Sequence, residues 1–195
     1  MRPLPTMKIL ITTTIFSLAI ATNAAEVSLN TSPMVDSIIF SGEITKGDSE
    51  KVSALIEKVA NNGKIHQFTI HSPGGNITAA MDIGNLLRAN VFIVFEPLGT
   101  SCISACIFTI AGGSQRIIAG QVGLHHPYLP QPHLSALEPL VQSEGKKAMV
   151  LYMKKMGVQG SLIDAMYSLS NANEVRYLTA DEMKFYQLTT ENERN

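Results

Sequence analysis

The distribution of apolar residues divides most of the chain into short strands that alternate with amphipathic helices. Residues 37–44 alternate between apolar and polar side chains, which is typical of a half-buried strand. In residues 48–60, Val52, Ile56 and Val59 recur at helical spacing and place their side chains on one face. The same two patterns repeat along the rest of the chain. The further elements expected are strands at 67–70, 91–95, 116–118 and 122–125, and helices directly after Ser104 and at 78–88, 134–156, 161–168 and 180–186.

The order of these elements predicts an α/β fold. Parallel strands need a crossover connection, which is usually a helix, so strands that alternate with helices indicate a mostly parallel sheet. Helices then cover both faces of this sheet. Sites in such sheets form at the carboxyl ends of the strands, and we therefore expect functional residues in the loops that follow them.

The start of the chain has the pattern of a secretory signal peptide. A positively charged beginning is followed by segment 9–21, which contains no charged residue, and then by small residues. The apolar run is shorter than the roughly 20 residues that span a bilayer, so a stable membrane anchor is not expected. We expect residues 1–24 to be removed after Ala24, and residues 25–195 to form a single domain in the periplasm or outside the cell.

The charge composition argues against a nucleic-acid partner and does not identify another partner. The 195-residue chain has 15 Lys and Arg against 16 Asp and Glu, and both signs are interspersed. This balance indicates neither the basic surface of a nucleic-acid-binding protein nor an acidic tail. We therefore expect no nucleic-acid partner. The expected mature chain of about 170 residues is long enough to form one domain with a full hydrophobic core.

Two short segments contain the residue types that serine acyl transfer requires. The chain leaves the small-residue turn 99–101 and enters an apolar helix near Ser104, where free N–H groups and the helix dipole would stabilise negative charge. A helix cap is the simpler interpretation of this serine alone, and Ser101 is a competing nucleophile. His125, at the end of an expected strand, is a candidate general base, with His126 beside it as the alternative.

A glycine-containing loop upstream could supply backbone donors to the same site. In Ser72–Gly75, proline stiffens the turn and the glycine pair can adopt positive φ, so a backbone N–H can point at a developing oxyanion. An ordinary strand-to-helix turn would have the same sequence. A phosphate-binding loop is not indicated, because no Gly-Lys-Ser pattern accompanies the glycines. Ala105, directly after the candidate nucleophile, is a suitable second N–H donor.

The two cysteines of the chain, Cys102 and Cys106, flank the candidate nucleophile. An oxidising compartment favours a disulfide, but a bond between residues four apart needs a non-helical backbone between them. We therefore favour buried structural thiols over a disulfide. We expect neither a metal nor another cofactor, since no further cysteine is present and the histidines lack a zinc-binding spacing.

Together these segments resemble the Clp protease proteolytic-subunit family, within the crotonase-like superfamily. The resemblance covers residues 38–182 and is most specific in 68–127, where strand, Ser-Pro-Gly-Gly loop, serine turn and His-x-Pro follow in the family's order. It implies a mostly parallel sheet flanked by helices, with a protruding helix after the strand that ends in the catalytic histidine. The family's nucleophile, general base and two oxyanion donors match, in that order, Ser104, His125, Gly75 and Ala105.

The resemblance breaks at the third member of the catalytic triad. The family has an aspartate just before Arg176, where this chain has Val175, and the polar candidates nearby are Asn173, Glu174 and Asp164. Loss of the orienting acid usually costs several orders of magnitude in turnover. Three interpretations are open: a weak Ser–His dyad, a triad in which an asparagine orients the imidazole, and an inactive descendant.

The general base has a further candidate. Secreted members of the superfamily, such as signal-peptide peptidases, use lysine as the base, and Lys146 and Lys147 are available for that role. Both are expected in the middle of a helix among other polar residues, which indicates solvated side chains. We therefore favour a histidine.

The expected export and the resemblance favour a periplasmic serine peptidase or other acyl hydrolase that acts on peptides or unfolded proteins. The resemblance implies a homo-oligomer that packs through the helix at 138–156, without indicating how many subunits it has. Because ATP is absent outside the inner membrane, we expect no ATPase unfoldase as a partner. The alternative is a catalytically weakened or inactive peptide-binding or assembly module, which Val175 favours. Acyl-coenzyme A chemistry is disfavoured, since export would separate the protein from that cofactor.

Overall fold

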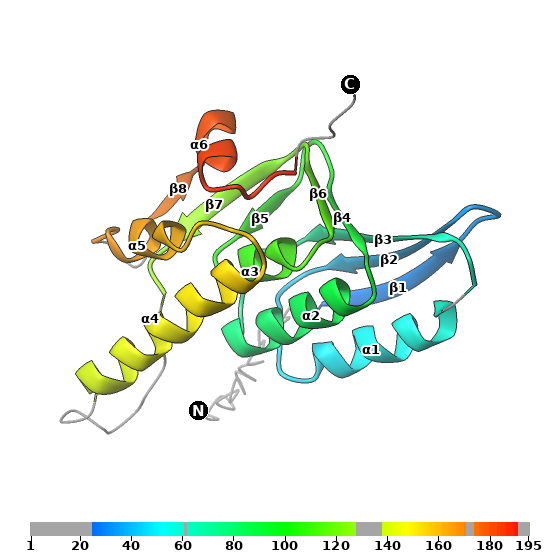
Figure 1. Ribbon diagram of the computed structural model, residues 1–195, viewed down its shortest axis with the longest axis horizontal. Coiled ribbons are helices and arrows are strands. Elements are labelled where there is room, and N and C mark those ends of the chain that lie inside the picture. Colours follow the sequence, from blue (N-terminus) through cyan, green and yellow to red (C-terminus); the bar gives the residue numbers. More distant parts are fainter. Residues whose placement is uncertain (1–24, 61, 128–137, 171–173, 191–195) are drawn as a thin grey trace, which may run out of the picture.

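The computed structural model describes residues 25–60, 62–127, 138–170 and 174–190. Strands and helices alternate through most of this part of the chain (Figure 1). The strands are β1 (Glu26–Thr31), β2 (Val35–Ser41), β3 (Ile65–His71), β4 (Ile93–Glu96), β5 (Ser101–Ile103), β6 (Gln115–Ile118), β7 (Gln121–His125) and β8 (Val175–Tyr177). The helices are α1 (Asp48–Val59), α2 (Ile77–Ala89), α3 (Cys106–Ala111), α4 (Glu138–Lys155), α5 (Ser161–Tyr167) and α6 (Ala180–Phe185).

The strands form two sheets. The larger one has the order β1-β2-β3-β4-β6, in which only β1 runs antiparallel to its neighbour. The smaller one has the order β5-β7-β8, with β5 parallel and β8 antiparallel to β7. Helices flank these sheets, and Figure 1 shows α1 and α2 side by side against the larger one. The expected α/β class with flanking helices is confirmed.

One face of the larger sheet forms much of the core. Along β2 and β3, Ile38, Phe40, Phe68 and Ile70 are buried, while the residues between them are partly or fully exposed. This alternation is what a strand with one buried face requires. It also explains why the apolar pattern of β2 and β3 could be recognised in the sequence.

Three strands, β1, β5 and β8, were not expected, and β2 ends at Ser41 and not at residue 44. β5 and β8 have three residues each, which is too short for a periodic pattern. β1 lies on the edge of the larger sheet, and its side chains are at most half-buried, so it lacks a strong apolar signal. The expected helix start at residue 134 lies outside the described residues, and α4 is described from Glu138. None of the described helices is long and apolar enough to cross a membrane.

α2 and α3 approach each other at two glycines. A Cβ atom on Gly112 would overlap the backbone of Gly84, and a Cβ atom on Gly84 would overlap Tyr152 Oη. That tyrosine donates a hydrogen bond of 2.7 Å to Phe108 O, and burial raises its pKa. Because neither glycine has a side chain, the two helices can lie closer than other residues would permit.

Two arginines bind backbone carbonyl groups behind α3. The buried side chain of Arg116 donates hydrogen bonds of 3.0–3.3 Å to the carbonyl oxygens of Gly113, Met156, Gln187 and Leu188. Arg88 donates to the carbonyl oxygens of Ala111, Gly112 and Met156. Burial, together with the charge of Arg88, lowers the pKa of Arg116 to about 10. These bonds join the ends of α3 and α4 to the segment that follows α6.

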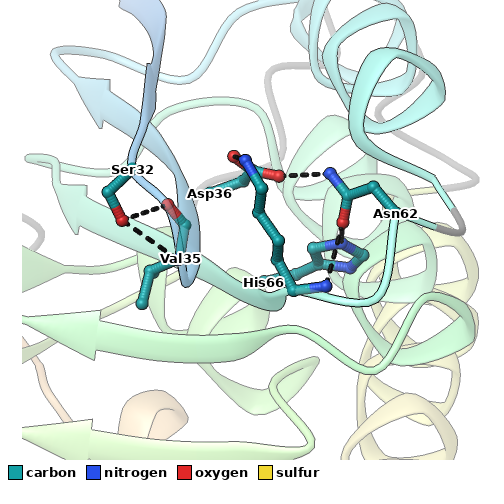
Figure 2. Close-up of polar contacts among 6 residues, drawn as sticks. Ser32, Val35, Asp36, Asn62 and His66 are labelled. Carbon is teal, nitrogen blue, oxygen red and sulfur yellow. Dashed lines mark hydrogen bonds and ion pairs between the residues drawn. The ribbon is translucent and has the colours of Figure 1, made fainter.

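A second polar cluster lies at the amino ends of β2 and β3 (Figure 2). Asp36 is buried, and its carboxylate accepts hydrogen bonds from Asn62 Nδ2 and, at 3.1 Å, from Lys64 Nζ. Figure 2 shows the Asn62 amide facing both Asp36 and His66, and His66 Nε2 is 3.3 Å from Asn62 Oδ1. The Asn62 hydrogen bond, with help from Lys64, holds the pKa of Asp36 below its ordinary value. Since the cluster's polar groups pair with one another, we assign it a structural role.

Candidate functional site

A cavity of about 720 Å³ lies at the carboxyl ends of β2 and β3 and beside the smaller sheet. Its wall comes from the β2–α1 loop, the β3–α2 loop with the first turn of α2, the turn between β5 and α3, and the ends of β7 and β8 that face each other. Three of the four residues expected at the site, Ser104, His125 and Gly75, line this cavity. The structure thus brings together three expected residues that span 50 positions of the sequence, from Gly75 to His125.

The backbone turns sharply at Ser104. Its φ of +56° is left-handed, which is uncommon for a residue other than glycine. The Ser104 N–H donates to Gly123 O at 2.9 Å, and the Ser104 carbonyl accepts from Ile107 N at 3.2 Å. Ala105 is the N-cap residue of α3 and no side chain caps this helix, so Ser104 is not the simple helix cap that its sequence position allowed. A serine on a sharp strand-to-helix turn is how α/β-hydrolases expose a nucleophile.

Cys102 and Cys106 form a disulfide, so the expectation of two buried thiols is wrong. Both residues are fully buried, and their Cα atoms are 5.4 Å apart, within the usual range for the bond. The helical geometry that argued against the bond is absent. Cys102 belongs to β5, Ser104 has a left-handed backbone, and Cys106 is the first residue of α3.

The glycine pair places an unpaired amide on the cavity wall. Gly74 and Gly75 have φ values of +104° and +128°, and a Cβ atom on Gly75 would overlap Ile44 O. Ile44 N donates to Gly74 O at 2.7 Å, and Asn76 N donates to Ile44 O at 2.8 Å. The Gly74 N–H is bound by Ser72 Oγ at 3.1 Å. The Gly75 N–H has no acceptor among the described residues.

The amide of Ala105 is unpaired as well. Ala105 is fully buried and directly follows Ser104, and its N–H donates to no acceptor in the part of the chain that the structure describes. Buried N–H groups without a partner are rare in native proteins. A carbonyl oxygen of a bound ligand could accept from both this amide and that of Gly75, while a hydroxyl attacks its carbon.

His125 and His126 differ in their surroundings. His125 lines the cavity, whereas His126 does not. The Nδ1 atom of His126 is 2.8 Å from Leu169 O, and its ring meets that of Tyr167 edge-on at 5.3 Å between centroids. Within the described residues, no hydrogen bond joins the Ser104 hydroxyl to His125; catalytic hydrogen bonds are often long in unliganded sites. The geometry therefore favours His125 over His126 as the residue that can reach a ligand.

Val175 occupies the place where an orienting acid would lie. It is directly opposite His125 in the antiparallel pairing of β7 and β8, and it lines the same cavity. Opposed residues share a face of the sheet, with Cβ atoms about 4.5–5.5 Å apart. Glu174 is exposed and does not line the cavity, and Asn173 lies outside the described residues. Among the described residues, the imidazole therefore has no carboxylate partner.

The lysines proposed as alternative bases are engaged elsewhere. Lys146 Nζ is 2.7 Å from Asp164 Oδ1 and 5.1 Å from the ring centroid of Tyr167. Lys147 Nζ is 2.6 Å from Glu144 Oε1. Neither lysine lines the cavity, and neither does Asp164, so the structure does not bring them to the candidate nucleophile.

The β2–α1 loop was not expected at the site, yet its residues 43–46 line the cavity. Glu43 Cγ lies 3.0 Å from the position that a Cβ atom would take at Gly75. The Glu43 side chain therefore packs against Gly75, whose amide is unpaired. The available signals were Gly42 and Gly47 on either side of the loop, and its place after a parallel strand.

A buried carboxylate holds this loop in place. Asp48 Oδ2 accepts hydrogen bonds from Thr45 N at 2.6 Å and from Thr45 Oγ1 at 2.9 Å. Asp48 Oδ1 is 2.8 Å from Lys51 Nζ. Burial raises the pKa of Asp48, but the hydrogen bonds from Lys51 and Thr45 outweigh burial, so the pKa lies below its ordinary value.

Replacing Asp48 by asparagine should lower the free energy of unfolding by about 1–2 kcal/mol at neutral pH, because the amide cannot accept all three hydrogen bonds. A carboxylate whose pKa is lowered by folding stabilises the protein above its unfolded-state pKa, and this stabilisation is lost as the pH falls. The difference between wild type and variant should therefore shrink below about pH 4. Urea unfolding of the wild type and the variant, at neutral and at acidic pH, measures the difference in the free energy of unfolding at each pH. Asp82→Asn, at an exposed position of α2, is the control, and a difference that does not depend on pH would contradict the prediction.

No group of three or more His, Cys, Asp or Glu side chains able to hold a metal ion occurs in the described parts of the chain. The groups that the cavity presents are a hydroxyl, an imidazole and a glycine amide, with the amide of Ala105 next to the hydroxyl. These are the groups that acyl transfer uses for attack, proton transfer and stabilisation of the oxyanion.

No family model matches this chain, and no curated protein sequence matches it either. Among solved structures, the chain is similar to the 1510-N membrane-bound stomatin-specific protease, solved as a serine-to-alanine mutant, with a TM-score of 0.63 and 16% sequence identity. The match covers 80% of this chain and 76% of that chain. At this level of identity the likeness shows the fold alone. The chain therefore has a Clp protease-like α/β fold, as the sequence resemblance implied.

Proposed function

We propose that the protein is a serine hydrolase in which Ser104 is the nucleophile and His125 is the general base. The Ser104 hydroxyl attacks the acyl carbonyl, and His125 accepts its proton and returns it to the leaving group. The N–H groups of Gly75 and Ala105 bind the carbonyl oxygen as it becomes negative. The observation that supports this proposal is that the hydroxyl of Ser104, the imidazole of His125 and the acceptor-free amide of Gly75 line one cavity, with the acceptor-free amide of Ala105 directly after the hydroxyl.

The substrate that we propose is a peptide or an unfolded protein. The similar solved structure is that of a protease, which favours an amide bond over other acyl groups. The cavity wall combines the apolar side chains of Ile77, Ile103 and Val175 with the charged Glu43 and Lys46. A peptide offers both apolar and charged side chains to such a wall.

We further propose that the protein acts in the periplasm or outside the cell, after removal of residues 1–24. The disulfide agrees with this location, because such bonds persist mainly in oxidising compartments. No ATPase unfoldase would then serve the site. Self-association through α4 is supported by two exposed leucines, Leu140 and Leu151, which lie on one face of that helix because they are three turns apart.

Labelling with a fluorophosphonate probe tests the proposed function. We expect the wild-type protein to be labelled at Ser104, with the modified peptide identified by mass spectrometry, because the probe reacts much faster with an activated serine than with an ordinary one. Ser104→Ala should lose the label, whereas the matched variant Ser101→Ala should keep it. An unlabelled wild type, or equal labelling of Ser104→Ala, would contradict the proposal.

A second candidate function is a peptide-binding or assembly module that has lost most of its activity. The observation that favours it is Val175, which faces His125 across β7 and β8 where an acid would be needed. Peptide binding that is unchanged in Ser104→Ala, together with an unlabelled wild type, would support this function instead.

A further inference from the structure

We propose that the Cys102–Cys106 disulfide positions the nucleophile, by holding Ser104 and Ala105 in the conformation that reacts. This inference rests on the proposed function. The bond joins the middle of β5 to the first residue of α3, and the loop that it closes contains Ile103, Ser104 and Ala105. The candidate hydroxyl and one candidate oxyanion donor are therefore neighbours inside one small covalent ring.

Besides the disulfide, backbone hydrogen bonds hold this turn, among them those from Ile107 N to Ser104 O at 3.2 Å and from Phe108 N to Ala105 O at 3.1 Å. Ile103 N donates to Ser72 O at 3.0 Å, and Ser104 N donates to Gly123 O at 2.9 Å. Beyond Ser104, the Ala105 N–H has no acceptor among the described residues. A non-glycine residue in the left-handed region is unfavourable by itself and persists only where its surroundings impose it. The disulfide is the strongest such constraint at this turn, because it fixes both ends of the segment covalently.

The size of the loop separates this role from general stabilisation. A disulfide stabilises a fold mainly by restricting the unfolded chain, and this effect grows with the length of the closed loop. Here the bonded residues are only four apart, so the restriction of the unfolded chain is small compared with that of other disulfides. The larger consequence is local: opening the bond frees the backbone at Ser104 and moves the hydroxyl and the Ala105 amide together.

The sulfur atoms are difficult to reach from solvent. Reduction by a dithiol would transfer two electrons and two protons to the sulfur atoms, giving two thiols, while the dithiol becomes a disulfide. Cys102 and Cys106 are both 0% exposed, so a mild reductant should leave the bond of the folded protein intact. Substitution is therefore a sharper test than reduction.

The experiment compares the wild type with the double variant Cys102→Ala/Cys106→Ala, both purified from an oxidising compartment. We expect the second-order rate constant for fluorophosphonate labelling of Ser104 to fall about tenfold in the double variant, because the reactive conformation becomes a minor one. With a peptide ester as substrate, kcat should fall while KM changes little, since the rest of the cavity wall is untouched. Thiol alkylation under denaturing, non-reducing conditions shows whether the wild type contains the bond.

Ile56→Ala is the control for lost stability. Ile56 is a buried residue of α1, which does not contribute to the turn, and its truncation should lower Tm. At a temperature well below the Tm of every variant, Ile56→Ala should be labelled at the wild-type rate.

Three results would overturn the inference alone: equal labelling rates in the wild type and the double variant, equal slowing in Ile56→Ala, or free thiols in the labelled wild type. An unlabelled wild type would overturn the proposed function, and the inference with it. Failure of the inference and failure of the proposed function can be told apart, because the three results against the inference all require that the wild type be labelled.

Discussion

A Val175→Asp variant is expected to hydrolyse a peptide ester about 100-fold faster than the wild-type protein. The new carboxylate would lie directly opposite His125 in the β7–β8 pairing, on the same face of the sheet. It could accept the hydrogen bond of one imidazole nitrogen and leave the other nitrogen free to accept the proton of Ser104. It would also stabilise the imidazolium that forms during attack, which the wild-type valine cannot do.

The magnitude follows from triads in which the acid has been removed. That change costs about 10⁴-fold in kcat, and one inserted carboxylate should recover part of it, since the rest of the site has not adapted to the new group. The measurement is kcat for a peptide ester, with fluorophosphonate labelling as a second readout.

Val175→Asn is the matched control for this gain. Asparagine has nearly the size of aspartate and can orient the ring by a hydrogen bond, but it has no charge to stabilise the imidazolium. We expect a smaller increase than with aspartate. If both variants fold and neither has a higher kcat than the wild type, the missing acid is not the only reason for low activity. The peptide-binding module then becomes the better interpretation.

Replacing Arg116 by methionine should lower the free energy of unfolding by about 3–4 kcal/mol. Its guanidinium donates to four carbonyl groups from three parts of the chain, and a buried acceptor that loses its donor retains the full cost of its desolvation. Methionine fills similar space, so the effect should come mainly from the lost hydrogen bonds. Denaturant unfolding monitored by circular dichroism gives the value.

Two further variants serve as controls for the effect of Arg116→Met. Arg116→Lys keeps the positive charge but not the planar group with several donors, so an intermediate loss is expected. Arg176→Met removes a surface ion pair with Glu182, which is 2.6 Å long, and should cost less than about 1 kcal/mol. If Arg116→Met costs no more than Arg176→Met, the carbonyl contacts of Arg116 do not stabilise the fold.

The candidate site residues that could be recognised in the sequence are those that stand in short local motifs. The glycine pair follows a recognisable strand and His125 ends one, so their placement at the ends of parallel strands could be expected, whereas Ser104 was recognised from the small-residue turn and apolar helix around it. The structure places Gly75, Ser104 and His125 on the wall of one cavity, and their catalytic roles are a proposal. The choice between His125 and His126 needed the contact of His126 with Leu169, which is distant in the sequence.

The features that could not be expected depend on backbone conformation or on long-range pairing. The disulfide requires the left-handed backbone of Ser104, and a helical pattern in the sequence gives no sign of it. The pairing of Val175 with His125 depends on β8, whose three residues are too few for a periodic signal. The β2–α1 loop contains no motif of its own and reaches the cavity through its backbone pairing with Gly74.

The glycine-to-glycine contact of α2 and α3 has a consequence for chemistry at the opposite ends of these helices. α2 begins two residues after Gly75, and α3 begins directly after Ala105. If Gly75 and Ala105 bind the oxyanion as proposed, the separation of their amides should depend on how closely Gly84 and Gly112 meet. A single extra methyl group at that meeting point would push the helices apart and spread the donors, although it lies outside the cavity wall. Selection for turnover could thus act on positions that no substrate ever touches.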